Sequence, residues 1–223
     1  MNLVTEIDRE AERQLVSTIS QARPEDAIVG EEGTFVPGNS GVCWILDPLD
    51  GTTNFVHGHA HHSVAVGVEI DGKRVLGVVH DTDRDCVYSG IAGQGAECDG
   101  REIFASRAAK LSHALIGTGF LPIAQVRIRQ AEVLRHILPK IRDLRRSGCP
   151  SLDLCAVAAG TLDGFYEAGL GRWDIAAGAS IAEAAGAQVV ELESPILPHP
   201  LLVAANAELL AQLVGALREA GAL

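Results

Sequence analysis

The sequence predicts an α+β protein made of two layered subdomains, 1–110 and 111–223, that form one compact unit with a soft boundary near residues 108–115. Three observations support this. The front half carries one helical pattern followed by consecutive strand patterns joined by turn signals. The back half alternates helical and strand patterns. The composition is that of a folded domain, with 47% hydrophobic and 21% charged residues among 223.

In the front half, hydrophobic periodicity defines the elements. Residues 8–19 place Ala11, Leu15 and Ile19 on one face of a helix, which Arg23-Pro24 ends. A polar, glycine-containing loop is expected at 33–41, and Asp71-Gly72 is typical of a hairpin turn. The strands are expected at 27–29, 42–46, 63–70, 75–80 and 86–91.

In the back half, glycines mark the ends of helices. Gly160 follows one helical pattern and Gly186 follows an alanine-rich one, as is common for residues just past a helix. The predicted helices are 124–141, 151–159, 174–185 and 208–220. The predicted strands are 115–118, 163–167, 189–190 and 201–205.

Charge and cysteine content exclude several classes of function. The net charge of −11 argues against a nucleic-acid surface, which needs a basic face. Five cysteines without a C-x-x-C spacing favour reduced thiols in a cytoplasmic protein. The first residues lack the basic and apolar regions of a signal peptide, and no apolar stretch reaches membrane-spanning length. We therefore expect no direct contact with nucleic acid or membrane.

The most informative segment follows the apolar run 42–46. This run reads as a buried strand and is followed by two carboxylates, Asp47 and Asp50, separated by a proline and a leucine. Like charges at close range repel each other, and burying them unpaired is costly. We therefore expect a cation at this point. Hard oxygen ligands favour magnesium, manganese or calcium over zinc.

Two further acidic features lie far from this segment in the sequence. Glu31 and Glu32 follow a short predicted strand, and Asp174 begins a predicted helix after Trp173. Each has an ordinary interpretation when taken alone: the glutamates as solvated surface, and Asp174 as a helix N-cap. The combination predicts that these carboxylates converge around divalent cations.

These residues belong to motifs that resemble the inositol monophosphatase family of magnesium-dependent, lithium-sensitive phosphomonoesterases. The chain looks closest to the bacterial branch that includes the extragenic suppressor proteins. The similarity runs from residue 4 to about residue 205. The matching segments are V-T-E-I-D at 4–8, G-E-E at 30–32, 44–55 with D-P-L-D-G-T-T-N-F, R-S-G at 146–148, L-D-L at 152–154, D-G-F-Y-E at 163–167 and W-D-I-A-A-G at 173–178.

The resemblance implies a layered αβαβα sandwich of the type that inositol monophosphatase shares with fructose bisphosphatase, here without the usual first helix, and a homodimer. It also implies a ligand set for two or three Mg²⁺ ions, with Mn²⁺ as an alternative and inhibition by Li⁺. Glu31, Asp47 and the backbone oxygen of Leu49 would hold the first ion. Asp47, Asp50 and Asp174 would hold the second, and Glu31 would reach a third through water.

The resemblance further assigns the chemistry. Thr52, working with Glu31, would orient and deprotonate the attacking water, with Asp47 as the bridging ligand. The N–H groups of Gly51 and Thr52 would face the phosphate, and Glu167 would contact a hydroxyl of the organic part. The catalytic set is thus Glu31, Thr52 and Asp47. The substrate-binding set is Asp50, Gly51, Thr52, Glu167 and Asp174.

The substrate and the role of the protein stay open at this stage. Inositol 1-phosphate is the default of the family, whereas relatives handle fructose 1,6-bisphosphate, histidinol phosphate and phosphoadenosine phosphate. In the family, a backbone N–H near the position of Pro150 helps to bind inositol. Pro150 itself has no N–H, which favours a substrate with a different alcohol. A mainly non-catalytic role, as a protein partner in a bacterial transcription complex, is the alternative from another class.

Overall fold

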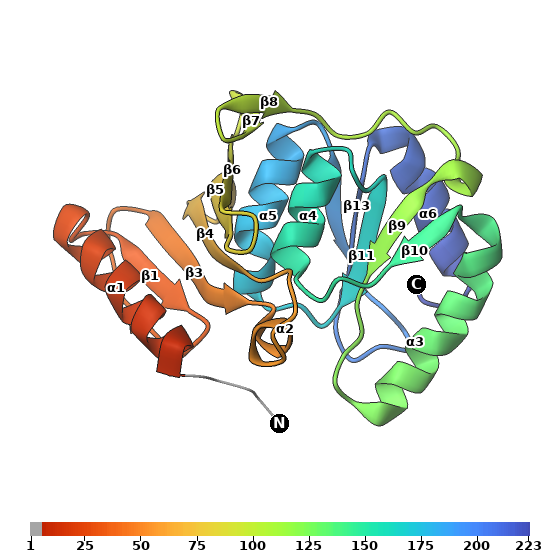
Figure 1. The fold of residues 1–223 in the computed structure, drawn as a ribbon, viewed down its shortest axis with the longest axis horizontal. Coiled ribbons are helices and arrows are strands. Elements are labelled where there is room, and N and C mark those ends of the chain that lie inside the picture. The colour runs from red at the N-terminus through yellow and green to blue at the C-terminus, as the bar shows by residue number, and fades with distance from the viewer. Residues whose placement is uncertain (1–5) are drawn as a thin grey trace.

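The structure, a computed structural model, describes residues 6–223, so that Val4 and Thr5 of the first motif lie outside it. Helices and sheets alternate in five layers (Figure 1), which confirms the predicted αβαβα sandwich. One helix covers the outer face of the first sheet, two lie between the sheets, and two cover the second sheet. The outer helix is α1 (Glu6–Ala22). The helices between the sheets are α4 (Pro150–Ala158) and α5 (Arg172–Ala184), and those that cover the second sheet are α3 (Ala124–Ile137) and α6 (Ala207–Glu219).

The first sheet has eight strands in the order β2-β1-β3-β4-β5-β6-β7-β8. It is antiparallel except for the parallel pair β1 and β3, so that most neighbours are joined by short turns. The strands are β1 (Ala27–Gly30), β2 (Phe35–Val36), β3 (Val42–Asp50), β4 (Ser63–Ile70), β5 (Lys73–Asp81), β6 (Cys86–Ile91), β7 (Gly95–Cys98) and β8 (Arg101–Ile103).

The second sheet has five strands in the order β10-β9-β11-β13-β12. Its strands β9, β10 and β11 run parallel, and β13 is antiparallel to both of its neighbours. The two sheets divide the chain between residues 103 and 115, but α4 and α5 pack between them, so the division into two subdomains stays a prediction. The strands are β9 (Leu115–Thr118), β10 (Asp143–Arg145), β11 (Gly164–Ala168), β12 (Gln188–Leu192) and β13 (Leu201–Ala205).

Most predicted elements are present, and the exceptions have physical causes. The predicted helix 124–141 ends at Ile137 and continues as a 3₁₀ turn, η2 (Leu138–Lys140), because Pro139 cannot donate the next helical hydrogen bond. The strands β2, β7, β8 and β10 were not predicted, since β2, β8 and β10 have only two or three residues and β7, with the sequence G-A-E-C, has no apolar run. Within residues 6–223, no helix has both the length and the apolar composition needed to cross a bilayer.

Helix α5 packs directly against the first sheet because three glycines form a row beneath it. Gly67 pairs with Gly77, and Gly77 pairs with Gly90, across the strands β4, β5 and β6. A Cβ atom at Gly77 would lie 2.1 Å from the backbone oxygen of Ala177, and one at Gly67 would lie 2.6 Å from the Cβ of Ala176. The missing side chains therefore fix the height of α5 above the sheet, and with it the position of its first turn.

We predict that Gly77→Ala lowers the free energy of unfolding by about 1–3 kcal/mol, because α5 must move away from β5 to admit the methyl group. Urea denaturation measures this change. Gly215→Ala is the control, since nothing lies within 4 Å of its added Cβ in α6. That variant should be neutral or up to about 1 kcal/mol more stable. Equal effects of the two substitutions would show that the glycine row does not set the packing.

Candidate functional site

A bulge in β3 brings two carboxylates to the same face of the first sheet. Residues three apart in a regular strand point to opposite faces. In this structure Asp47 pairs with Ala65 and Asp50 pairs with Ser63, so β3 contains one residue more than β4 across this interval. Pro48, which has no N–H to donate, lies within the irregular segment. The bulge therefore turns both side chains toward one site.

Asp174 completes a group of three carboxylates. Oxygen atoms of Asp47, Asp50 and Asp174 lie within 4.8 Å of one another, although the third comes from the far end of the chain. Asp174 lies in the first turn of α5, where its Oδ2 accepts a hydrogen bond from the N–H of Gly171 at 2.5 Å. It is thus a capping residue and a member of the acidic cluster at the same time. The other carboxylate oxygen of Asp174 is left for a different partner.

Asp47 lies at the centre of the site, and within the described part of the chain its carboxylate has too few hydrogen-bond donors. Its side chain is fully buried, and its Oδ1 accepts a hydrogen bond from the N–H of Leu49 at 3.1 Å. Its Oδ2 receives no hydrogen bond from a fixed donor among residues 6–223. The neighbouring group is the carboxyl of Glu31, which can hydrogen-bond to Asp47 only while one of the two carries a proton. A buried oxygen of this kind is what a bound cation would satisfy.

Asp50 is held by the first turn of α4. Its Oδ2 accepts hydrogen bonds from the N–H of Ser151 at 2.7 Å and from the Oγ of Ser151 at 2.5 Å, and the Sγ of Cys149 lies 3.1 Å away. The Oγ of Ser63 on β4 lies 2.7 Å from that of Ser151. Ser151 and Ser63 could not be recognised as partners of Asp50 from the sequence, because these residues are far apart in the chain and have no distinctive spacing.

The electrostatics of the cluster favour a bound cation. Burial raises the pKa of Asp47 well above its usual range, and the charges of Asp50, Glu31 and Asp174 add to this effect. Burial and the charge of Asp50 raise the pKa of Asp174 to about 8, and burial raises that of Glu31 to about 7. Within residues 6–223, no Lys, Arg or His forms an ion pair with these four carboxyls. The donors are all oxygen atoms, which fits a hard divalent cation such as Mg²⁺.

Glu31 reaches the cluster from a loop that helix α1 holds in place. The N–H of Glu31 donates to the oxygen of Leu46 at 3.1 Å. The buried carboxylate of Glu12, on α1, accepts from the N–H of Glu32 at 3.0 Å and from the hydroxyl of Thr34 at 2.5 Å. Gly30 leaves room for this carboxylate, because a Cβ at that position would lie 2.2 Å from it. Sequence reasoning missed Glu12, which looks like an ordinary polar residue of an amphipathic helix.

The turn after Asp50 opens a short helix, α2 (Thr52–Val56). Gly51 has φ of 83°, a left-handed conformation that glycine adopts at low cost, and a Cβ there would lie 2.7 Å from the oxygen of His61. The hydroxyl of Thr52 donates to the backbone oxygen of Leu49 at 3.0 Å. Asn54 anchors this turn, because its Nδ2 donates hydrogen bonds to the backbone oxygens of His61 at 2.8 Å and of Ser147 at 2.9 Å.

Glu167 and Asp153 lie on the side of the second sheet. Glu167, on β11, is half-buried against Gly119, and burial together with the charge of Asp153 raises its pKa to about 8. Asp153, on α4, is buried with one oxygen unpartnered, and burial raises its pKa to about 7. Asp153 also lines a cavity of about 390 Å³ that none of the three clustered aspartates lines. Asp153 belongs to the L-D-L motif at 152–154, but the sequence pattern around it did not predict that its side chain would be buried.

Comparison with known proteins gives consistent matches over this whole architecture. The pattern of the Inositol monophosphatase family matches residues 1–222. The inositol-1-monophosphatase SuhB of Mycobacterium tuberculosis is 45% identical over 84% of this chain and 68% of its own length. The Nus factor SuhB of Pseudomonas aeruginosa is 40% identical over 83% of this chain and 71% of its own. The extragenic suppressor protein SuhB of Bartonella henselae superposes with a TM-score of 0.90 at 34% identity, covering 97% of this chain and 84% of that one.

We predict that Glu12→Ala weakens Mg²⁺ binding by about 10–100-fold, because the loop that carries Glu31 loses its anchor. Isothermal titration calorimetry measures the affinity. Glu10→Ala is the matched control, since Glu10 lies exposed on the same helix, where it pairs with Arg13 and accepts a hydrogen bond from Gln14. An unchanged affinity in the Glu12 variant would show that α1 does not position the loop.

The raised pKa values also predict a pH dependence of stability. In the folded, metal-free protein the pKa of Glu31 is raised to about 7 and that of Asp174 to about 8. In the unfolded chain the same carboxyls lose their protons near pH 4, so that between about pH 4 and pH 8 the folded state binds more protons than the unfolded state. The free energy of unfolding should therefore fall as pH rises through this range. Thermal unfolding with a chelator should show a Tm that decreases from pH 5 to pH 8, and Mg²⁺ should restore it most at pH 8. A metal-free Tm that rises over the same range would contradict the assignment.

Proposed function

Since the chain belongs to the inositol monophosphatase family, a family of phosphatases, we propose that it hydrolyses phosphomonoesters of small polyols or sugars in a Mg²⁺-dependent reaction. The observation that carries this proposal is the group formed by Asp47, Asp50 and Asp174, in which Asp47 has a buried oxygen without a donor. A cluster of like charges without cationic side chains is costly to bury, so its presence points to a bound ion.

Five residues supply the proposed ligands. Glu31, Asp47 and the backbone oxygen of Leu49 would hold the first Mg²⁺, and Asp47, Asp50 and Asp174 would hold the second. The unpartnered Oδ2 of Asp47 supports its role as the shared ligand. Glu31 lies outside the group of three but beside Asp47, which suits a ligand of the first ion that also reaches a third through water. When bound, these ions would neutralise the carboxylates, polarise the phosphoryl oxygens and acidify a water molecule.

Thr52 and Glu31 would activate the nucleophile. The hydroxyl of Thr52 already has one fixed direction, because it donates to Leu49, and its lone pairs can accept a hydrogen bond from water. In this proposal the hydroxyl would turn its single proton from Leu49 to the carboxylate of Glu31 when water binds. It would then pass that proton to Glu31 as it accepts one from the water, so that the water loses a proton and Glu31 gains one. No side chain needs to form a covalent bond to phosphorus, because positioning and charge stabilisation dominate phosphoryl transfer.

The organic part and the phosphate would be held on opposite sides of this centre. The left-handed conformation of Gly51 exposes backbone at the start of α2, where the N–H groups of Gly51 and Thr52 would face the phosphate. Glu167 would accept a hydrogen bond from a hydroxyl of the alcohol. The charges of Asp50 and Asp174 both act on Glu167, which supports its position in the same site. Asp50 and Asp174 would border the bound ester.

Inositol 1-phosphate is the first substrate to test, because relatives at 45% identity are named inositol-1-monophosphatases. Pro150 argues for a wider panel. It opens α4 without an N–H, and the N–H of the next residue, Ser151, is engaged by Asp50. Release of phosphate from inositol 1-phosphate, fructose 1,6-bisphosphate, histidinol phosphate and phosphoadenosine phosphate would rank the substrates. Li⁺ should inhibit, and Mn²⁺ should substitute for Mg²⁺.

The proposal places the protein in the cytoplasm as a homodimer. Five cysteines, all of them free in the structure, fit a reducing compartment. The homodimer is carried over from the family resemblance. Sedimentation equilibrium would test the dimer.

A second candidate function has its own support, because relatives at 39–40% identity are named Nus factor or putative Nus factor SuhB. In this alternative the protein would act mainly as a partner in a bacterial transcription complex. Asp47→Asn separates the two roles, since a partner surface does not need the acidic site. Retained association with the transcription machinery by that variant, together with no phosphatase activity in the unmodified protein, would favour the alternative.

We predict that Asp47→Asn lowers kcat for phosphate release by at least about 100-fold, because it removes the shared charge and retains the shape of the side chain. Steady-state assays over a Mg²⁺ titration measure this change.

The control for this variant is Asp85→Asn, which removes a carboxylate from an exposed turn where Asp85 pairs with His80. Its activity should equal that of the unmodified protein. Near-normal turnover of the Asp47 variant would refute the assignment of the site.

A further inference from the structure

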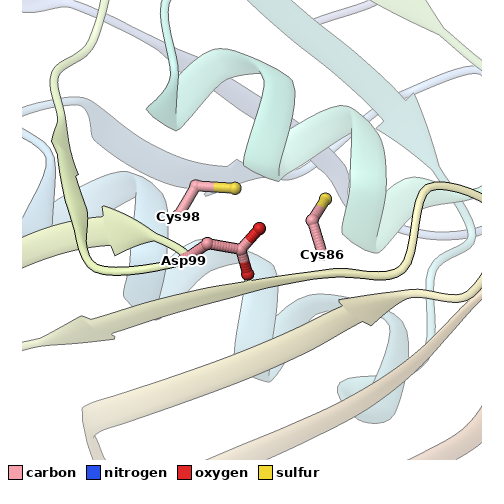
Figure 2. Close-up of side chains that lie close together, drawn as sticks. All are labelled: Cys86, Cys98 and Asp99. Atoms are coloured by element: carbon pink, nitrogen blue, oxygen red, sulfur yellow. The ribbon is translucent and has the colours of Figure 1, made fainter.

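A second group of potential metal ligands lies outside the acidic centre. Side-chain atoms of Cys86, Cys98 and Asp99 lie within 4.8 Å of one another. Figure 2 shows the carboxylate of Asp99 between the two cysteines. Cys86 begins β6 and Cys98 ends β7, and both are half-buried and free of disulfide bonds. The proposed phosphatase reaction uses none of these three residues.

The strand register places both thiols on the same face of the first sheet. Cys98 pairs with Tyr88, and Cys86 lies two residues before Tyr88 on the same strand. Cys86 and Cys98 are therefore diagonal rather than directly opposite neighbours. Diagonal positions have Cα atoms about 7–8 Å apart, whereas a disulfide usually requires less than about 7 Å. An ion held by two bonds of about 2.3 Å to sulfur spans the wider gap without movement of the strands.

The third ligand is held by the turn that joins β7 and β8. Asp99 has φ of 49° and Gly100 has φ of 74°, the left-handed pair typical of a tight hairpin turn. The N–H of Asp99 donates to the oxygen of Val87 at 3.0 Å, and the Oδ1 of Asp99 accepts from the N–H of Val87 at 2.9 Å. These bonds orient the carboxylate toward the thiols, and such support is typical of carboxylate ligands.

The environment of Cys98 does not suit a reactive thiol. Burial and the proximity of Cys86 raise its pKa to about 11, so at neutral pH the thiol is protonated and a weak nucleophile. A reactive or redox-sensing cysteine has the opposite property. A thiophilic cation can displace these protons, because it supplies the positive charge that stabilises two thiolates at close range.

We propose that Cys86, Cys98 and Asp99 form a binding site for a thiophilic divalent cation such as Zn²⁺. Two sulfur ligands and one carboxylate oxygen, with water in the fourth position, give the tetrahedral coordination that Zn²⁺ prefers. The site differs in chemistry from the acidic centre, whose ligands are all oxygen and suit Mg²⁺. Bound metal would link the start of β6 to the turn between β7 and β8.

Co²⁺ is the probe for this site, because bonds between cobalt and thiolate absorb in the near ultraviolet and bonds between cobalt and carboxylate do not. The unmodified protein, reduced and held in excess Mg²⁺ to fill the acidic centre, is titrated with Co²⁺. We expect the absorption to reach its maximum at one equivalent and to be lost when one equivalent of Zn²⁺ is added. Absence of this absorption from the unmodified protein would overturn the proposal without any variant.

Variants locate the ligands. Cys86→Ser and Cys98→Ser should each abolish the absorption, and Asp99→Asn should weaken Co²⁺ binding at least tenfold. Cys43→Ser is the matched control, since Cys43 is also half-buried but lies in β3, and it should retain the absorption. Circular dichroism confirms that each variant is folded. Absorption that persists in both folded serine variants, or a disulfide between Cys86 and Cys98 under these reducing conditions, would also overturn the proposal. Phosphatase activity is not a readout here, so the two proposals fail independently.

Discussion

The repulsion among carboxylates at the end of β3 is the constraint on which the rest of the site depends. Asp47, Asp50 and Asp174 are brought within 4.8 Å of one another, and Glu31 lies beside Asp47. The folded chain provides hydrogen-bond donors to only some of their oxygens, which leaves Asp47 with an unpartnered Oδ2. The packing energy of the surrounding layers must therefore hold together a cluster that would otherwise separate. The proposed cation would relieve this repulsion, and the protein supplies the geometry in which it could do so.

Each layer of the sandwich contributes to that geometry. The outer helix α1 anchors the loop of Glu31 through Glu12. The bulge of β3 aligns two aspartates, and the glycine row beneath α5 fixes the height of the turn that carries Asp174. The first turn of α4 binds Asp50 through Ser151. These supports are far apart in the sequence, so that the rigidity of the site comes from the stacking of the layers rather than from any local motif.

The sequence predicted the layers better than the local geometry. The strands β4, β6, β9 and β13 have the predicted bounds, because each is a run of four or more mostly apolar residues between clear turn signals. The motifs also identified the acidic residues that the fold brings together. The bulge at Pro48 was not predictable, since periodicity would place Asp47 and Asp50 on opposite faces. The partners Glu12 and Ser151 are common polar residues whose roles arise only from tertiary contacts, and the pair Cys86 and Cys98 depends on strand register.

The distribution of the acidic group along the chain has a consequence for biosynthesis. Asp47 and Asp50 lie in the first quarter of the sequence, whereas Asp174 and Ser151 belong to helices that the ribosome produces much later. A nascent chain that has emerged only as far as the first sheet displays β3 and its two aspartates without α4 or α5 above them. The group of Asp47, Asp50 and Asp174 therefore cannot form during translation until α5 has left the exit tunnel and settled on the glycine row, so that the proposed metal site exists only after the fold is complete.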